Sequence, residues 1–102
     1  MEKIVLSVNK VPIRLTEERW LHITEEHSEM AGYYYDAIET ISSPHAIFAG
    51  KSGECIATKT LSEGKSLVVV YREVSREDGF VITAFITSKT KQFERRVKLW
   101  PL

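Results

Sequence analysis

The spacing of hydrophobic residues changes near residue 45, and this change divides the chain into two parts. Before it, Trp20, Ile23, His27 and Met30 follow one another at steps of three and four, which places them on one face of a helix. After it, apolar and polar residues alternate, as they do in strands with one buried face. The pattern therefore predicts an α+β protein with its helices first and most of its strands second.

Two helices are predicted, over residues 16–30 and 33–43. Thr16 is a good N-cap residue, and the two acidic residues after it suit the positive end of the helix dipole. Gly32 can take the left-handed conformation that ends a helix. Pro44 disfavours helical backbone in the residue before it, so the second helix should stop there.

Four strands are predicted after the helices, over residues 46–49, 54–60, 66–74 and 80–88. The connections between them are short, which favours antiparallel pairing of successive strands. The third strand contains a continuous apolar run at residues 67–71, as expected of a central strand buried on both sides. We therefore expect an antiparallel meander of four strands.

The two ends of the chain carry weaker signals. Short strands are expected at residues 3–8 and 11–14, and Pro12 restricts the second to a sheet edge or to a very short length. Residues 89–102 fit both helical and alternating spacing, and we expect a loop followed by a short strand or helical turn. Trp100 should pack on the body of the protein.

The predicted architecture is one domain, residues 1–102, with two N-terminal helices packed on a four-stranded antiparallel sheet and one or two short N-terminal strands. The 102 residues, 43% of them hydrophobic, suffice for one small core. The helices should cover one face of the sheet and leave the other partly open.

Cysteine content and hydropathy limit the cellular location and the kinds of site that are expected. Cys55 is the only cysteine, so neither an internal disulfide nor a site with several thiolate ligands can form, and a cytoplasmic location is expected. No apolar run is long enough to span a bilayer, and the N-terminus is too short and interrupted for a signal peptide. We expect no membrane partner, no bound metal and no cofactor.

The net charge is zero, but its distribution is uneven. Residues 1–44 contain four Lys and Arg against eight Asp and Glu, whereas residues 89–102 contain five Lys and Arg against one Glu. A basic end can meet a polyanion even in a neutral chain, but such charges also serve simply to solvate a terminal segment. The sequence leaves both interpretations open. The basic residues of this end are Lys89, Lys91, Arg95, Arg96 and Lys98.

The histidines are the first candidates for chemistry. His27 lies on the helix face directed at the sheet, either as a core-edge residue bonded to a backbone carbonyl or as a proton shuttle near neutral pH. His22 falls on the polar side, five residues earlier, which is poor spacing for a metal site shared with His27. His45 follows Pro44 and is expected to be a turn residue.

The last two strands carry the other candidates. Alternation in the fourth strand predicts an apolar face under the helices, formed by Phe80, Ile82, Ala84 and Ile86. The opposite face would present two hydroxyls around an aromatic ring, in Val81, Thr83, Phe85 and Thr87. Arg72 interrupts the apolar run of the third strand, and the strand register decides whether it shares the face of Thr83. The sequence allows both registers.

Several segments together resemble the phage-associated nuclease-like domains of the barnase–EndoU–colicin–RelE superfamily, over roughly residues 13–88. The matching segments are Arg19-Trp20-x-His22-Ile23-x-x-x-His27-x-Glu29, Ser43-Pro44, Leu67-Val68-Val69-Val70 and Gly79-Phe80-x-Ile82-Thr83-Ala84-Phe85. By this resemblance, His22 and His27 match the family's helix histidines and Thr83 its strand hydroxyl, while Arg72 matches by residue type only. The chain departs from the family at Ser28, where a proline is common, and at Phe85, where a tyrosine is common.

The resemblance implies a metal-independent ribonuclease with N-terminal helices on a four-stranded antiparallel sheet. Members of the superfamily are frequently toxins, and they cut RNA by attack of the 2′-hydroxyl on the adjacent phosphate. The expected partners are then RNA, such as tRNA or ribosome-associated mRNA, and an antitoxin protein. Phenylalanine at position 85 removes a phenol that could donate a proton or contact phosphate.

On this basis we expect His27 to act as general base or acid with His22 as its partner. Arg72, with Lys89 or Lys91, would stabilise the charge on phosphate. Substrate would be bound or oriented by Thr83, Thr87, Arg95 and Arg96. The alternative is a non-catalytic module with the same fold that binds nucleic acid or protein. A catalytic site needs a histidine within reach, through one phosphate, of a strand cation or hydroxyl.

Overall fold

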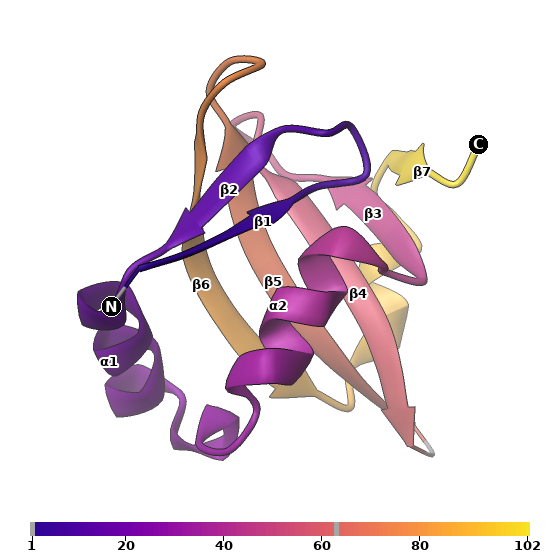
Figure 1. The fold of residues 1–102 in the computed structure, drawn as a ribbon. Helices are drawn as coiled ribbons and strands as arrows, with labels where there is room; N and C mark the ends of the chain where they lie inside the picture. The colour runs from indigo at the N-terminus through magenta and orange to yellow at the C-terminus, as the bar shows by residue number, and fades with distance from the viewer. Residues whose placement is uncertain (1, 63) are drawn as a thin grey trace.

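A seven-stranded mixed sheet runs through the molecule in the order β1-β2-β6-β5-β4-β3-β7, with two α-helices on one side of it (Figure 1). The structure is a computed structural model and describes residues 2–62 and 64–102. In chain order the elements of these residues are β1 (Lys3–Leu6), β2 (Pro12–Leu15), α1 (Glu17–Glu26), the 3₁₀ helix η1 (Ser28–Met30), α2 (Tyr34–Ser42), β3 (Ala46–Ala49), β4 (Cys55–Ser62), β5 (Lys65–Glu73), β6 (Gly79–Thr87), the 3₁₀ helix η2 (Thr90–Phe93) and β7 (Lys98–Trp100).

The antiparallel meander is present, but the sheet is larger than predicted. Strands β3 to β6 pair antiparallel in succession, as expected from their short connections. Residue 63, in the predicted turn between β4 and β5, lies outside the described residues. The two predicted N-terminal strands are present, but the prediction of a four-stranded sheet was wrong because they and a C-terminal strand also pair into it. Hydrophobic alternation identifies strands but does not show which strands pair.

The first two strands form a hairpin, in which β1 pairs antiparallel with β2. Strand β2 then pairs parallel with β6 at only two positions, Ile13 with Gly79 and Arg14 with Phe80. Pro12 is tolerated because it is the first residue of a very short strand, although that strand is not at the edge. At the other side of the sheet, β7 pairs antiparallel with β3.

The first helix is shorter than predicted. Thr16 caps it as expected, and its Oγ1 accepts a hydrogen bond from the backbone N–H of Arg19 at 3.0 Å. The helix ends at Glu26 because His27 leaves the helical region, with φ −130° and ψ 75°. Gly32 has the expected positive φ, 89°, and α2 follows. Neither helix in the described residues has the length and apolar character needed to cross a bilayer.

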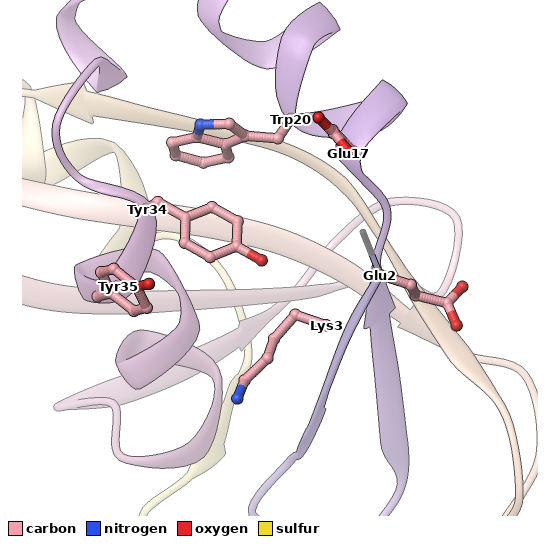
Figure 2. Close-up of a pocket in the computed structure, with 6 residues that line it drawn as sticks. All are labelled: Glu2, Lys3, Glu17, Trp20, Tyr34 and Tyr35. Carbon is pink, nitrogen blue, oxygen red and sulfur yellow. The ribbon is translucent and has the colours of Figure 1, made fainter.

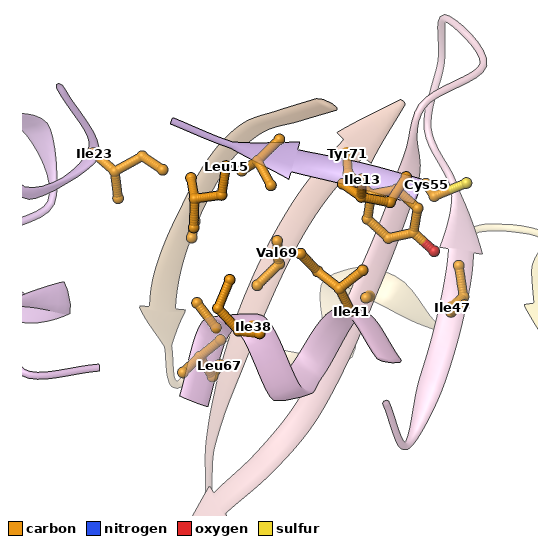
Figure 3. Packing of buried hydrophobic residues seen from close by; sticks show 14 of the residues in the cluster. Ile13, Leu15, Ile23, Ile38, Ile41, Ile47, Cys55, Leu67, Val69 and Tyr71 are labelled. Atoms are coloured by element: carbon orange, nitrogen blue, oxygen red, sulfur yellow. The ribbon is translucent and has the colours of Figure 1, made fainter. Parts of the chain in front are cut away.

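The main core lies between the helices and the sheet. Figure 3 shows Ile23 of α1, Ile41 of α2 and Val69 of β5 facing into it, and each is at most 2% exposed. A smaller cluster lies on the opposite face of the sheet, where Phe93 of η2 packs over Ile56 and Val68. The C-terminal segment therefore covers part of the face that the helices leave uncovered.

A β-bulge in β6 changes which of its side chains face the helices. Thr83 lies opposite Val70, but Val81 lies opposite Tyr71, so Ile82 is an extra residue in the strand. Val81 consequently faces the main core and is 2% exposed. Phe80 shares the other face with Arg72. The predicted apolar face of β6 is therefore right for Ala84 and Ile86, which pack in or against the main core, and wrong for Phe80 and Ile82, because alternation holds only along a regular strand.

Candidate functional site

The open face, defined here as the face of the sheet opposite the helices, carries the predicted site residues of β5 and β6. Thr83 lies opposite Val70, whose side chain belongs to the cluster on this face. Arg72 is two positions after Val70 on the same strand and so shares its face. Of the two registers that the sequence allows, the structure has the one that brings Arg72 to the face of Thr83.

Arg14 and Phe80 also lie on the open face, although the sequence pattern placed neither of them there. Ile13 and Leu15 of β2 are buried in the main core, so Arg14 between them points to the open face. The parallel pairing of β2 with β6 sets Arg14 beside Phe80, and Arg72 lies on the other side of Phe80. An aromatic ring thus lies between two arginines on three adjacent strands. No local sequence signal could reveal this row, because it depends on pairing between distant segments.

Arg14 is anchored by a bidentate ion pair with Asp78. Its Nε lies 2.9 Å from Oδ1, and its Nη2 donates to Oδ2 at 3.2 Å. Hydrogen bonding to the guanidinium lowers the pKa of the Asp78 carboxyl. Beside this pair lies a hollow of about 270 Å³ lined in part by Phe80 and by Arg19 of α1. This end of the open face therefore combines positive charge with an aromatic ring.

A second hollow, of about 330 Å³, lies farther across the open face, between the sheet, the β3–β4 turn and the C-terminal segment. Its lining includes Val70, Phe85 and Phe93, with Lys51 and Arg96 as cations. Glu54 also lines it, and hydrogen bonds from backbone N–H groups lower the pKa of that carboxyl, with smaller contributions from nearby arginines. The hollow offers apolar contact and positive charge together.

Arg72 and Arg96 are both held by backbone carbonyls near the β3–β4 turn. Nη1 of Arg72 donates to the Ser52 carbonyl at 2.9 Å, and Nη1 of Arg96 donates to the Ala49 carbonyl at 3.3 Å. The remaining guanidinium N–H groups can still donate to an anion, since each guanidinium has five. The two cations are therefore kept at defined positions on this face.

His27 reaches the open face from the end of α1. Its ring packs against that of Phe85, with centroids 5.7 Å apart and planes tilted by 38°. Its Nδ1 lies 3.6 Å from Oε2 of Glu29, and the same oxygen accepts from the backbone N–H of Ile86 at 3.4 Å. The pairing between β2 and β6 ends at Phe80, so Ile86 lies beyond it and its N–H is available to Glu29. The side chain of His27 is about one-third exposed.

The other predicted residues divide between the open face and solvent. His22 is exposed on α1. The Thr87 hydroxyl accepts from the backbone N–H of Lys89 at 3.0 Å, which holds the start of the C-terminal segment. Lys89, Lys91 and Arg95 are exposed. The structure thus brings five of the candidates to one face and leaves the other four exposed to solvent. The five are His27, Arg72, Thr83, Thr87 and Arg96.

Two other polar residues have structural roles. Cys55 is buried in β4, and burial raises the pKa of its thiol. His45 lies in the junction before β3, where Nδ1 accepts from the backbone N–H of Thr60 at 2.9 Å. Within residues 2–62 and 64–102, no three His, Cys, Asp or Glu side chains are grouped so as to hold a metal ion.

Comparison of the chain with models of known families, with curated proteins and with solved structures finds no match. The resemblance to nuclease-like domains stays a prediction from the sequence.

Proposed function

We propose that the open face binds single-stranded RNA and that His27 takes part in cutting it, without a metal ion. The observation that carries this proposal is the setting of His27. Its ring packs on Phe85 of the open face, on the strand that also carries Thr83, while its Nδ1 is directed at Glu29. Phe85 shares a strand face with Thr83 and lines one hollow with Arg96, so this part of the face holds an imidazole, a hydroxyl and a cation, the group types that acid–base cleavage of a phosphodiester needs.

The proposed chemistry assigns a role to each of these groups. The Glu29 carboxylate orients the imidazole through Nδ1 and leaves Nε2 to exchange a proton with a 2′-hydroxyl or with the leaving oxygen. Arg96, which lines one hollow with Phe85, stabilises the negative charge that develops on the phosphate being cut. Arg72 lies beside Phe80, farther along the strand, and would bind a neighbouring phosphate. Phe80 and Phe85 provide surfaces on which bases stack. Thr83 orients the phosphate.

The test is incubation of the purified protein with total RNA and with tRNA, in the presence and absence of a chelator. We expect cleavage that survives the chelator and falls about a hundredfold or more in His27→Gln, the usual share of a general acid or base. His22→Gln is the matched control, and we expect a smaller effect because His22 is exposed on α1. A folded His27→Gln variant that cleaves like the parent excludes His27 from the reaction.

A second candidate function is favoured by the row of Arg14, Phe80 and Arg72. An aromatic ring between two cations can bind single-stranded nucleic acid, because bases stack on the ring and phosphates bind the cations. Such binding requires no catalytic step. This module would bind RNA without cleaving it and would be insensitive to His27→Gln. Phe80→Leu should then weaken binding by about 1 kcal/mol or more, the usual loss when a base loses its stacking partner.

The toxin role remains part of the proposal and can be tested in cells. Expression of a ribonuclease toxin should arrest growth, whereas expression of His27→Gln at the same level should not. Growth arrest by both proteins would separate toxicity from RNA cleavage.

A further inference from the structure

Three aromatic rings on the helix side of the molecule form a pocket that the proposed RNA site does not use. Trp20 of α1 meets Tyr34 of α2 with ring centroids 5.2 Å apart and planes at 81°. Tyr34 meets Tyr35 at the same separation, 5.2 Å, with planes at 85°. Figure 2 shows these rings, here called the aromatic cage, around a pocket of about 510 Å³ that Glu2, Lys3 and Glu17 also line.

The lining of the pocket selects for a cation. The face of an aromatic ring carries partial negative charge and attracts a cation, and three such rings line this pocket. Figure 2 shows Glu2 and Glu17 on the side of the pocket across from Tyr35. Tyr35 is 78% exposed, so a guest can reach its ring from solvent. The carboxylate of Glu2 attracts a cation to the pocket, while the ammonium of Lys3 opposes one.

The surroundings indicate what kind of cation fits. Residues 16–43, which include both helices, contain seven Asp and Glu against a single Lys or Arg, Arg19. Glu39 is ion-paired with Lys59 of β4, but acidic residues still outnumber basic ones on the helices. The negative potential therefore extends beyond the pocket, over more surface than a small cation could contact. A chain with several positive charges complements it better.

We propose that the aromatic cage binds a lysine or arginine side chain of a basic segment of a partner protein. The exposed acidic residues of α1 and α2 would attract the rest of that segment and speed its association. This interaction does not depend on RNA cleavage, because the cage shares no residue with the open face.

Lys3 makes the proposal sharply testable. Its side chain lines the same pocket, so its ammonium competes with an incoming cation. Lys3→Gln should therefore tighten binding of a cationic guest, whereas it would weaken binding of an anionic one. The direction of this single change distinguishes the two kinds of ligand.

The experiment is an NMR titration that follows the two tryptophan indole N–H signals, because the chain contains two tryptophans. The probes are a flexible peptide with several arginines, the same peptide with citrulline in place of arginine, and tetramethylammonium chloride. We expect the arginine peptide to shift the Trp20 signal in a salt-sensitive way and to leave that of Trp100 unchanged. The citrulline peptide should have no effect, and tetramethylammonium should bind much more weakly.

Variants then test the role of the rings and of the charge. Tyr35→Leu should weaken binding of the arginine peptide by about two- to fivefold, which is the effect of losing one exposed cation–π contact. Tyr35→Phe keeps the ring and should leave the binding unchanged. Glu2→Gln should also weaken binding of the arginine peptide. Glu77→Gln, in the exposed β5–β6 connection, is the control and should leave binding unchanged. Tyr35 is largely exposed, so its variants should stay folded, which circular dichroism checks.

Four results would each overturn the proposal. They are equal binding of the citrulline peptide, unchanged binding by Tyr35→Leu, weaker binding by Lys3→Gln, and tetramethylammonium binding as tight as that of the peptide. The last would show that the cage takes a small organic cation and not a protein partner.

Discussion

At the scale of single residues, His27 depends on its neighbour Glu29. Glu29 contacts the imidazole and also accepts a hydrogen bond from the backbone of β6, so it links the histidine to the strand that carries Thr83 and Phe85. In the proposed reaction Glu29 is a positioning residue, because it acts on substrate only through His27.

Glu29→Gln tests this link. The amide oxygen can still accept from Ile86, so the fold should be retained, but the charge that holds the imidazole is lost. We expect kcat for RNA cleavage to fall about tenfold or more with little change in KM, since binding on the open face is untouched. Steady-state kinetics on a short RNA would check it, with Glu26→Gln on exposed α1 surface as the control. An equal loss in both variants would argue against a role specific to Glu29.

The buried hydroxyl of Tyr71 allows the effect of a single polar atom on the free energy of unfolding to be tested. Its side chain is fully buried opposite Cys55, whose thiol is only a weak partner for the hydroxyl, and the hydroxyl has no other hydrogen-bond partner in the described part of the chain. A buried hydroxyl without a partner costs about 1–3 kcal/mol. Tyr71→Phe should therefore leave the free energy of unfolding unchanged or raise it by about 1 kcal/mol, as measured by urea denaturation. A clear loss of stability would mean that the hydroxyl forms a bond in solution.

At the scale of elements, the Arg14–Asp78 pair fastens the N-terminal hairpin to the connection that precedes β6. The two strands share only two paired positions, and the buried side chains of Ile13 and Leu15 attach β2 to the core. The exposed ion pair adds a smaller contribution, because solvent screens the charges of an exposed pair. It also holds Arg14 beside Phe80, which matters for both candidate functions.

The pair predicts a pH dependence with a definite sign. The arginine lowers the pKa of Asp78 in the folded protein, so the pair stabilises the fold above the ordinary pKa of an aspartate, about 4. That stabilisation is lost as the pH falls through the lower, folded-state pKa. Relative to wild type, Asp78→Asn should therefore be less stable at pH 7, and the difference should shrink in acid. Denaturation at pH 7 and at pH 2–3 measures this, and a difference that does not change with pH would contradict it.

At the scale of the whole molecule, charge is separated between two sides. Acidic residues dominate the helices, while among the residues that the structure describes four cations lie at the open face or its hollows and outnumber the carboxylates of Asp78 and Glu54 there. The cations are Arg14, Lys51, Arg72 and Arg96. A polyanion should therefore approach the open face, and a basic partner the helices. The two proposed interactions use different surfaces and do not compete for residues.

The C-terminal arginines test this separation. Arg96 lines a hollow of the open face, whereas its neighbour Arg95 is exposed. Arg96→Gln should weaken RNA binding and reduce its dependence on salt by about one phosphate contact, and Arg95→Gln should do less. Binding measured at several salt concentrations separates the two. Equal effects would mean that the C-terminal segment acts only through its overall charge.

Local patterns were enough to predict most elements of this protein, but not the early end of α1 or the form of the C-terminal segment, and only part of its site. The α+β class, the Thr16 cap, the left-handed Gly32 and the antiparallel meander each follow from neighbouring residues, because caps, turns and alternation are local effects. His27, Thr83 and Arg72 were identified as candidates by residue type and spacing alone. Their chemical roles stay predictions.

Tertiary structure decided how these elements and residues come together. The pairing of β2 with β6 brings Arg14 beside Phe80, and the extra residue in β6 sends Val81 to the core and Phe80 to the open face. The end of α1 at Glu26 frees His27 to meet Phe85. Each outcome depends on contacts between segments far apart in the chain. Hydrophobic periodicity reports only which face of an element is buried, and it does not specify the segment that buries it.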